Sequence, residues 1–276
     1  MGDVTEACIA VIEVGGAPLS YEVVGTGPAL VLLHEGIADS RMYDEQVDAL
    51  ARQYRVVRYD QHGFGRSGMP TRAYAHHEDL HALLRHLGID RVALLGMSQG
   101  AAIALDFTLT YPARVGALLL LAPAVGGYLM GEATLALGEP IAAAFQAGDI
   151  AHAIELSVRL YVDGPRRAPD EVDPDVRARF RTMHIDYLRR TREGGRSADP
   201  LAPPASARLG EIHVPSLIAV GTGDIPHILE QADLLARTIP DARLVALPRV
   251  AHVFNMEQPA ETNRLALDFL REHYPY

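Results

Sequence analysis

The chain has 276 residues, of which 49% are hydrophobic and 22% charged, a composition typical of a globular enzyme and unlike that of a disordered chain. Its formal net charge of −10 argues against a nucleic-acid partner. All 25 basic residues are arginine, and the lack of lysine excludes Schiff-base chemistry, lysine-anchored pyridoxal phosphate and a P-loop.

Three features bear on where the protein works. Residues 1–14 lack the basic flank and the long apolar core of a signal peptide. The longest apolar run, residues 115–125, is too short to span a bilayer. The single Cys8 cannot form an internal disulfide, which fits a reducing compartment. We therefore expect a cytoplasmic protein with no membrane partner, whereas the oligomeric state stays open.

Apolar patterning in the first 124 residues predicts strands that alternate with helices. The first two strands are joined by a Gly-Gly-Ala-Pro turn and are expected to form a hairpin at a sheet edge. The later strands are continuous apolar runs, as in a parallel sheet buried on both faces. Strands are expected at 8–14, 19–24, 29–33, 54–59, 92–96 and 115–122, and helices at 41–52, 73–87 and after Gly100.

The pattern changes between residues 125 and 206, where no strand is expected. Helices are predicted there at 132–146, 149–162 and 174–192, with prolines and glycines between them. Strands then return at 214–220 and 243–247, with helices at 228–238 and 259–272. We expect an α/β core made of residues 1–124 and 207–276, with a mostly parallel sheet covered by helices on both faces, and a helical cap inserted at 125–206.

One turn in this pattern carries chemistry. Gly96-Met97-Ser98-Gln99-Gly100 fits G-x-S-x-G, the nucleophile elbow, in which a serine stands exposed on a strained turn between a strand and a helix. The two glycines leave room in the tight bend, and the start of the following helix favours negative charge beside Ser98. The five-residue pattern alone is weak, because many such matches are ordinary turns. The apolar strand before it and the apolar helix after it supply the context that the motif requires.

A serine hydroxyl needs an adjacent base that is oriented by an acid. In the architecture that carries this elbow, the acid and then the histidine follow the serine along the chain. Asp224 comes directly after the strand at 214–220, and His252 follows the strand at 243–247. Both positions lie at the carboxyl edge of the predicted sheet, where open α/β sheets place their sites.

The ordered motifs LLHEG, DQHGFGRSG, GMSQG, VGTGDIP and AHVFNMEQP resemble the α/β-hydrolase fold family, in the form that carries a helical cap. The resemblance covers nearly the whole chain and implies an eight-stranded sheet. It implies Ser98 as nucleophile, His252 as general base and acid, and Asp224 as the orienting acid. The backbone N–H groups of Gly36 and Gln99 would form the oxyanion hole, and no cofactor or metal is implied.

The chain departs from the family at Glu35, because the family places glycine directly after the histidine that corresponds to His34. If Glu35 turned into solvent it would change nothing. Our hypothesis is that it faces the site, where it selects against anionic substrates or supplies a second acid.

These features predict a serine hydrolase that acts through an acyl-enzyme on a small molecule, an uncharged, fairly apolar ester, lactone or related carbonyl compound. The serine argues against haloalkane and epoxide chemistry, for which related enzymes use aspartate. Two alternatives remain. The same triad could cleave a carbon–carbon bond or catalyse an elimination or cyclisation, and the fold could serve as a ligand receptor with little turnover.

Two further motifs are weighed against this interpretation. His77-Glu78-Asp79-Leu80-His81 matches the zinc motif H-E-x-x-H, but Leu87 stands where the extended form has a third histidine. We expect both histidines on a solvated helix face far from the carboxyl edge of the sheet. The run from Gly63 to Gly68 matches G-x-G-x-x-G but opens no helix, so we expect a loop beside the site, with Arg66 a partner of Asp60 and His62 a surface or loop residue.

Overall fold

The structure is a computed structural model that describes residues 9–191 and 197–275. The predicted strand at 8–14 is found from Ile9, and Cys8 lies outside the described residues.

The centre of the molecule is the predicted eight-stranded sheet, with the strand order β1-β2-β4-β3-β5-β6-β7-β8. β1 and β2 form the expected antiparallel hairpin at one edge, and β2 is also antiparallel to β4. All the other neighbours are parallel. The strands are β1 Ile9–Val14, β2 Ala17–Val24, β3 Ala29–Leu33, β4 Arg55–Tyr59, β5 Val92–Met97, β6 Val115–Leu121, β7 Ser216–Gly221 and β8 Ala242–Leu247.

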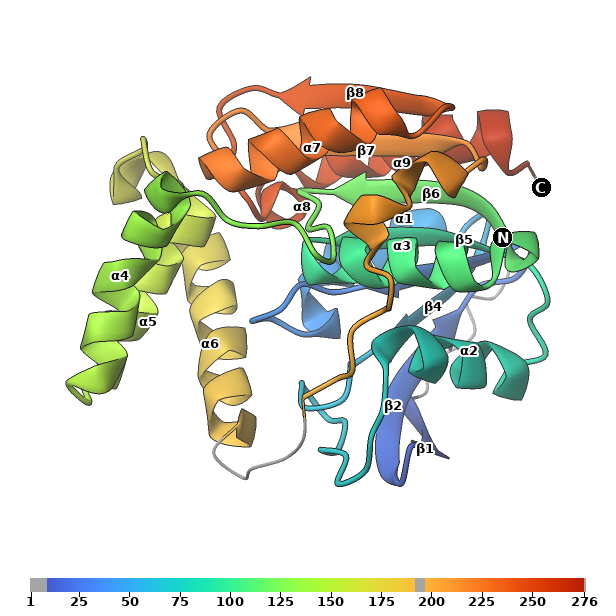
Figure 1. Cartoon of the computed structure of the whole chain (residues 1–276), viewed down its shortest axis with the longest axis horizontal. Helices are drawn as coiled ribbons and strands as arrows, with labels where there is room; N and C mark the ends of the chain where they lie inside the picture. Colours follow the sequence, from blue (N-terminus) through green and yellow to red (C-terminus); the bar gives the residue numbers. More distant parts are fainter. Residues whose placement is uncertain (1–8, 192–196, 276) are drawn as a thin grey trace.

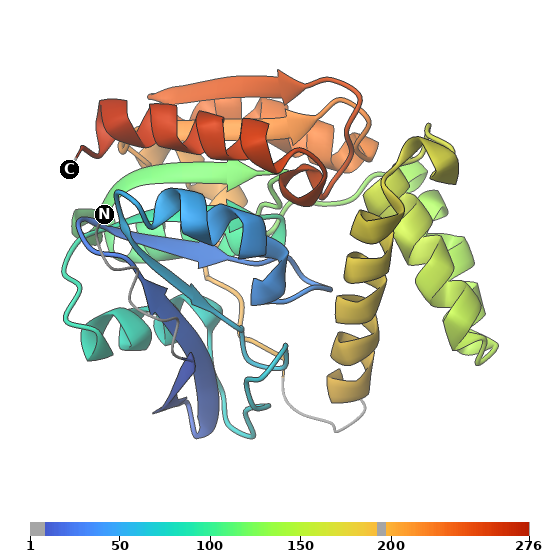
Figure 2. The same cartoon turned by 180° about the vertical axis from the view of Figure 1, so that it is seen from behind.

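Helices cover both faces of the sheet, as the alternating pattern predicts (Figures 1 and 2). One face carries α2 (His76–His86), α3 (Gln99–Thr110) and α7 (Pro226–Thr238), and the other carries α1 (Asp44–Leu50) and α9 (Pro259–His273). Every residue of β3, β5, β6 and β7 is buried, because each of these strands is packed by helices on both sides. The core therefore lies along the central strands, and their carboxyl ends meet at one edge.

Two predicted helices are shorter than the sequence suggests. The helix expected at 41–52 begins as a 3-10 turn, Ser40–Tyr43, and ends at Leu50. The helix expected at 73–87 begins only at His76. The short helix α8, Phe254–Glu257, follows His252 directly and was not predicted.

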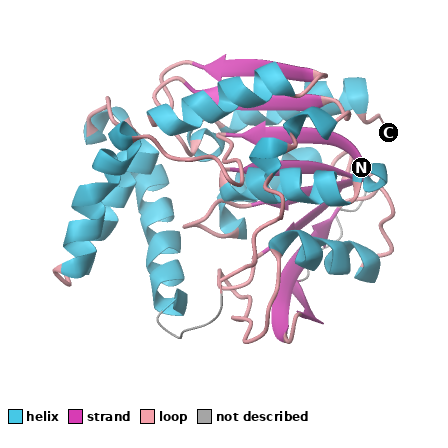
Figure 3. Cartoon of the chain, viewed as in Figure 1, coloured by secondary structure: helices cyan, strands magenta, loops and turns pink. Residues whose placement is uncertain are grey.

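Three helices stand beside the carboxyl edge of the sheet, in the segment for which the sequence predicts no strand (Figure 3). They are α4 (Glu132–Gln146), α5 (Ile150–Val158), which continues into the π-helical turn Arg159–Asp163, and α6 (Pro174–Thr191). After α6 the chain returns along α3, where Ser206 N–H donates to the carbonyl of Gly126 at 3.0 Å. The division into a core and a cap at residues 125–206 stays a prediction.

No helix in residues 9–191 and 197–275 is long and apolar enough to cross a membrane.

Candidate active site

Ser98 lies on a strained turn between β5 and α3. Its φ and ψ of 51° and −113° place it in a region that residues with a side chain rarely adopt. The flanking glycines make the turn possible: a Cβ on Gly96 would lie 2.3 Å from the carbonyl oxygen of Gly100, and one on Gly100 would lie 2.0 Å from that of Leu33. The neighbouring strand β6 holds the turn in place, because Ser98 N–H donates to the carbonyl of Leu121 at 2.9 Å. The chain therefore has the backbone of a nucleophile elbow at Ser98.

His252 and Asp224 are brought together at the carboxyl ends of β7 and β8. The two side chains are buried, and His252 Nδ1 lies 3.0 Å from Oδ2 and 3.2 Å from Oδ1 of Asp224. Because a carboxylate can only accept, Nδ1 carries the hydrogen in this contact, which leaves Nε2 as the basic nitrogen. Asp224 Oδ1 also accepts the N–H of Ile225 at 2.7 Å, which fixes the carboxylate.

His252 Nε2 is buried and makes no hydrogen bond with any residue that the structure describes. Its ring lies against the ring of Tyr161, with centroids 5.5 Å apart. Tyr161 lines a cavity of about 490 Å³ together with Ser98, Glu35, Gly36 and Gln99. The free nitrogen of His252 therefore belongs to the same region as the Ser98 hydroxyl.

Burial lowers the pKa of His252, but the negative charges of Asp224 and Glu35 outweigh this effect, so the pKa lies above its ordinary value. The imidazolium that forms when the ring takes up a proton is thus stabilised chiefly by Asp224, and further by Glu35 when that carboxyl is ionised.

Hydrogen bonds from neighbouring loops hold the segment that carries Gly36. His34 is fully buried; its Nδ1 lies 2.8 Å from the carbonyl oxygen of Glu35, and its Nε2 accepts the N–H of Gln61 at 2.9 Å. The Gln61 side chain donates to the carbonyl of His34 at 2.6 Å and accepts from Gln99 Nε2 at 2.7 Å. A chain of hydrogen bonds therefore links the end of β3 to the start of α3. It ties together the two segments that carry the N–H groups of Gly36 and Gln99.

Glu35 does not turn into solvent. Its side chain is buried at 3% exposure, and its Oε1 accepts the N–H of Ile37 at 3.1 Å. Burial raises the pKa of Glu35 to about 7, although His252 and the N–H groups of Ile37 and Gly36 act in the opposite direction. Glu35 also lines the cavity that contains Ser98, so a titratable carboxyl stands beside the nucleophile.

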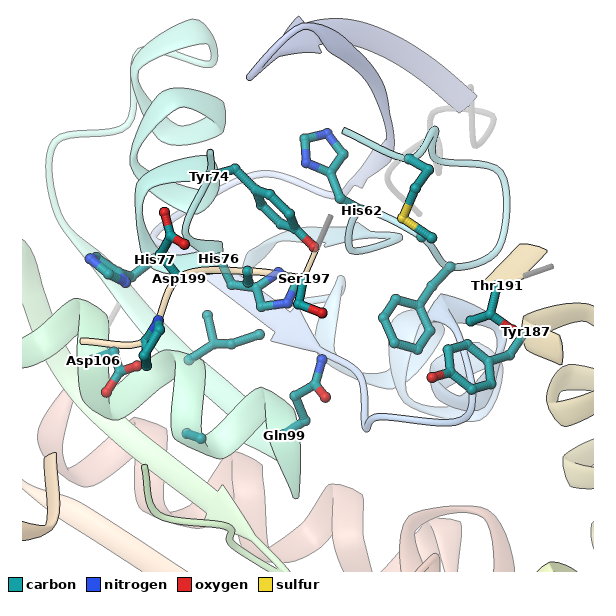
Figure 4. A pocket seen from close by; sticks show the side chains of 17 residues that line it. His62, Tyr74, His76, His77, Gln99, Asp106, Tyr187, Thr191, Ser197 and Asp199 are labelled. Atoms are coloured by element: carbon teal, nitrogen blue, oxygen red, sulfur yellow. The ribbon is translucent and has the colours of Figure 1, made fainter. Parts of the chain in front are cut away.

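A second cavity, of about 560 Å³, shares Gln99 and Ala102 with the first. It lies between α3, the loop after β4 and the end of α6 (Figure 4). In Figure 4 the side chain of Gln99 points into this cavity from the start of α3, with His62 and Tyr74 across from it and His76 and His77 to one side. The second cavity therefore adjoins the one that contains Ser98 at Gln99 and Ala102.

Burial shifts the pKa values of three groups that line the second cavity, His76, His77 and Asp106, toward their neutral forms. Burial lowers the pKa of His76 to about 3, helped by the neighbouring histidines, and it lowers that of His77 against the charges of Glu78 and Asp79. Burial raises the pKa of Asp106 to about 6, opposed by Arg208. Phe64 and Tyr187 complete the wall as a stacked pair with centroids 4.8 Å apart. The cavity thus offers aromatic faces, two histidines that are neutral at pH 7, and the Asp106 carboxyl.

His62 lies in the loop after β4, one of the two expected placements, but it is buried at 1% exposure, with Nδ1 3.1 Å from Oδ2 of Asp79. The expectation for the two histidines of H-E-x-x-H is wrong. His77 is buried, and because α2 begins beside the carboxyl edge of the sheet it lines the second cavity, not a distant solvated face. His81 is half-buried, and its ring centroid lies 4.1 Å from that of Tyr111. Among the described residues no group of three or more His, Cys, Asp or Glu side chains could hold a metal ion, so H-E-x-x-H has no third ligand there.

The glycine-rich loop after β4 lies beside the site, as expected, and its Phe64 forms part of the cavity wall. The expected contact of Arg66 with Asp60 is made by the backbone: Arg66 N–H donates to Oδ2 at 2.8 Å. A Cβ on Gly65 would lie 2.3 Å from that carboxyl group, which explains the glycine.

Sequence reasoning missed two residues that hold the His252 loop. The carbonyl of Tyr161 accepts the N–H of His252 at 3.2 Å. The Arg167 guanidinium donates to the carbonyl of Arg249 at 2.9 Å and to both carboxylate oxygens of Glu257, at 2.5 and 2.9 Å. Both residues come from the helical segment, far from His252 along the chain, and no sequence pattern marks them.

Comparisons with known proteins agree with this geometry. The family model described as the alpha/beta hydrolase fold matches residues 28–259. The chain is 27% identical to a 2-hydroxy-6-oxo-6-phenylhexa-2,4-dienoate hydrolase of Comamonas testosteroni, over 92% of this chain and 91% of that protein. Among solved structures it is similar to a hydrolase from Pseudomonas aeruginosa, with 29% identity, a TM-score of 0.76, and 96% and 98% of the two chains covered. It is also similar to Est816, described as an N-acyl homoserine lactone degrading enzyme, with 26% identity, a TM-score of 0.76, and 94% and 100% covered. The match over residues 28–259 identifies the chain as a member of the α/β-hydrolase fold family, and thus as a hydrolase.

Proposed function

We propose that the protein is a serine hydrolase that cleaves an uncharged ester, lactone or related carbonyl compound through a covalent acyl-enzyme. The observation that carries the proposal is the buried His252. Its Nδ1 is held by Asp224, its Nε2 has no hydrogen bond with a described residue, and its ring lies against Tyr161, which lines the cavity that contains Ser98. Such a ring is prepared to take one proton at one defined nitrogen.

In the proposed mechanism, His252 Nε2 takes the proton of Ser98 as Oγ attacks the substrate carbonyl. Asp224 holds the ring in the required tautomer and stabilises the imidazolium. The N–H groups of Gly36 and Gln99 hold the oxyanion, because Gln99 is the first residue of α3 and its N–H lies in the helical turn that lacks internal acceptors. His252 then returns the proton to the leaving group and activates the water that releases the acid.

The two cavities support an uncharged substrate that carries polar groups. The residues described as lining them include three carboxyl groups, Glu35, Asp106 and Asp199, and no arginine. An anionic substrate would find no arginine among these described lining residues, and Asp106, with a pKa of about 6, is mainly ionised at neutral pH and would repel it. The aromatic and polar wall of the second cavity suits an extended uncharged group with hydroxyl, carbonyl or amide functions. We infer that residues 125–206 act as the cap that closes over this space.

Carbon–carbon bond hydrolysis is the second candidate, favoured by the similarity to the Comamonas testosteroni enzyme. The name of that enzyme describes a dienoate, which is anionic at neutral pH, whereas the cavities here have no arginine among the described lining residues. The lining therefore favours the ester or lactone. A cytoplasmic location remains a prediction from the sequence.

The test begins with a fluorophosphonate probe on the wild-type protein and on Ser98→Ala. We expect labelling of the wild type alone. Turnover of p-nitrophenyl acetate and of a short lactone is then compared with turnover of 2-hydroxy-6-oxo-6-phenylhexa-2,4-dienoate. Ester or lactone turnover that Ser98→Ala lowers by about 10⁶-fold supports the proposal. Labelling with turnover of the dienoate alone indicates the carbon–carbon hydrolase. Labelling without turnover of either class favours a receptor, and equal labelling of both proteins refutes Ser98 as the nucleophile.

A further inference from the structure

The position of Glu35 is set by its neighbours. Tyr43 Oη donates to the carbonyl of Leu33 at 2.9 Å, and His34 Nδ1 lies 2.8 Å from the carbonyl oxygen of Glu35, so the backbone on this side of the site is fixed. The buried side chain turns back onto its own loop, where Oε1 accepts the N–H of Ile37 at 3.1 Å. Glu35 is thereby held at the wall of the cavity that contains Ser98, directly beside the N–H of Gly36.

The charge of this carboxyl decides what it does there. As a carboxylate it would stand in the same cavity as the oxyanion that forms during attack, and two negative charges close together in a partly buried site repel each other. It would also compete with the oxyanion for the N–H groups of Ile37 and Gly36, which stabilise the Glu35 carboxylate. As a neutral acid it has a proton to donate in the same place.

We propose that Glu35, in its neutral form, is a further catalytic residue, which donates a hydrogen bond from its carboxyl group to the substrate oxygen that becomes negative when Ser98 attacks. The inference rests on the function proposed above. The bond that forms joins Ser98 Oγ to the carbonyl carbon, the Ser98 proton passes to His252 Nε2, and Glu35 keeps its own proton. Glu35 thus adds a third donor to the N–H groups of Gly36 and Gln99.

Burial supports the neutral form. It raises the pKa of Glu35 to about 7, so that the protonated acid is well populated at neutral pH, and a bound substrate that excludes water raises it further. Five titratable groups, from four parts of the chain, interact electrostatically with Glu35. They are Asp39 and Tyr43 after β3, Tyr161 in the π-helical turn Arg159–Asp163, Tyr187 on α6 and His252 after β8. Only His252 among these groups is a base that becomes positive, and its charge lowers the pKa of Glu35 while the Glu35 carboxylate raises that of His252.

If Glu35 acted as a carboxylate and not as a neutral acid, the expected pH dependence of activity would be the opposite. If the carboxylate served only to stabilise the His252 imidazolium, activity would rise with pH as both groups lose their protons, and it would stay high. If the neutral acid is needed, kcat/KM rises as His252 loses its proton and falls again as Glu35 ionises. The sign of the alkaline change therefore separates the two roles.

The experiment measures kcat/KM for p-nitrophenyl acetate between pH 5.5 and 9.5 in the wild type, Glu35→Gln and Glu35→Ala. Glu35→Gln keeps a donor of similar shape that cannot ionise, so we expect activity within about tenfold of the wild type at pH 6 and no alkaline fall. Glu35→Ala removes the donor and should lose about 10²- to 10³-fold at pH 6. Glu139→Gln, which changes an exposed carboxyl on α4, is the matched control and should keep the wild-type profile.

A wild-type profile that rises to pH 9.5 without a fall overturns the inference, as does Glu35→Ala with wild-type activity. Melting curves and fluorophosphonate labelling are recorded for each variant, so that loss of folding or of the reactive serine is recognised. If the wild type is neither labelled nor active, the proposed function fails. If it is labelled and active but its pH profile is unchanged in the Glu35 variants, only the role of Glu35 fails.

Discussion

Arg167 joins the helical segment to the loop that carries His252, and its removal should be costly. Its guanidinium donates to the carbonyls of Val162 and Asp163, both at 2.7 Å, in addition to Arg249 and Glu257. The side chains of Arg167 and Glu257 are only 11% and 13% exposed. Arg167→Met keeps most of the aliphatic stem but leaves the Glu257 carboxylate and three carbonyl groups without this partner.

The magnitude follows from this burial. Removing one partner of a buried ion pair typically costs about 3–5 kcal/mol, because the other charge stays in the protein without compensation. With an unfolding entropy of about 2.1 cal/mol/K per residue, a cost of that size lowers the melting temperature by about 5–9 °C in a protein of 276 residues. The carbonyl of Arg249 is freed as well, and Arg249 has a φ of 63°, a conformation that its neighbours must hold in place. We therefore expect kcat to fall also, through a less ordered His252.

Thermal unfolding followed by circular dichroism, and turnover of p-nitrophenyl acetate, test this prediction. Arg166→Met is the matched control, since Arg166 is exposed, and it should melt within about 1 °C of the wild type. A double-mutant cycle with Glu257→Gln isolates the pair from the carbonyl contacts. If Arg167→Met melts with the control and retains full activity, the assignment of Arg167 as the link between the two regions is wrong.

Two other substitutions test the site. Asp224→Asn should lower kcat by about 10⁴-fold with little change in KM, because His252 then loses the carboxylate that selects its tautomer; a loss below about tenfold, measured by steady-state kinetics, would contradict the proposed pair. Ile103 lines the second cavity, and Ile103→Trp places an indole ring there. The substitution should raise KM for p-nitrophenyl octanoate by about tenfold or more, and KM for p-nitrophenyl acetate by less. Equal effects on both esters would show that substrates do not extend past Gln99.

Much of the site could be predicted from short-range patterns. Continuous apolar runs identify β3, β5, β6 and β7, because strands covered on both faces have no polar side. Gly96 and Gly100 mark the elbow, since no side chain fits at either position. Asp224 and His252 follow strand ends, and the carboxyl ends of parallel strands meet at one edge. The pairing of these two residues is found in the structure, and their catalytic roles stay predictions.

The rest depends on contacts between segments that are distant in sequence. The sequence does not distinguish a glutamate that points outward after a strand from one that points inward. Only the fixed loop around His34 places Glu35 in the interior, in the cavity that contains Ser98. The sequence around His62 and His77 is typical of surface residues. In the structure both are buried, His62 against Asp79 and His77 at the wall of the second cavity. Arg167 acquires its partners only when the helical segment packs on the loop after β8. The sequence by itself therefore determined the fold and the candidate catalytic triad, through periodicity, glycine sterics and strand order. Tertiary packing alone decided burial, and with it the charge state of the carboxyl beside the nucleophile.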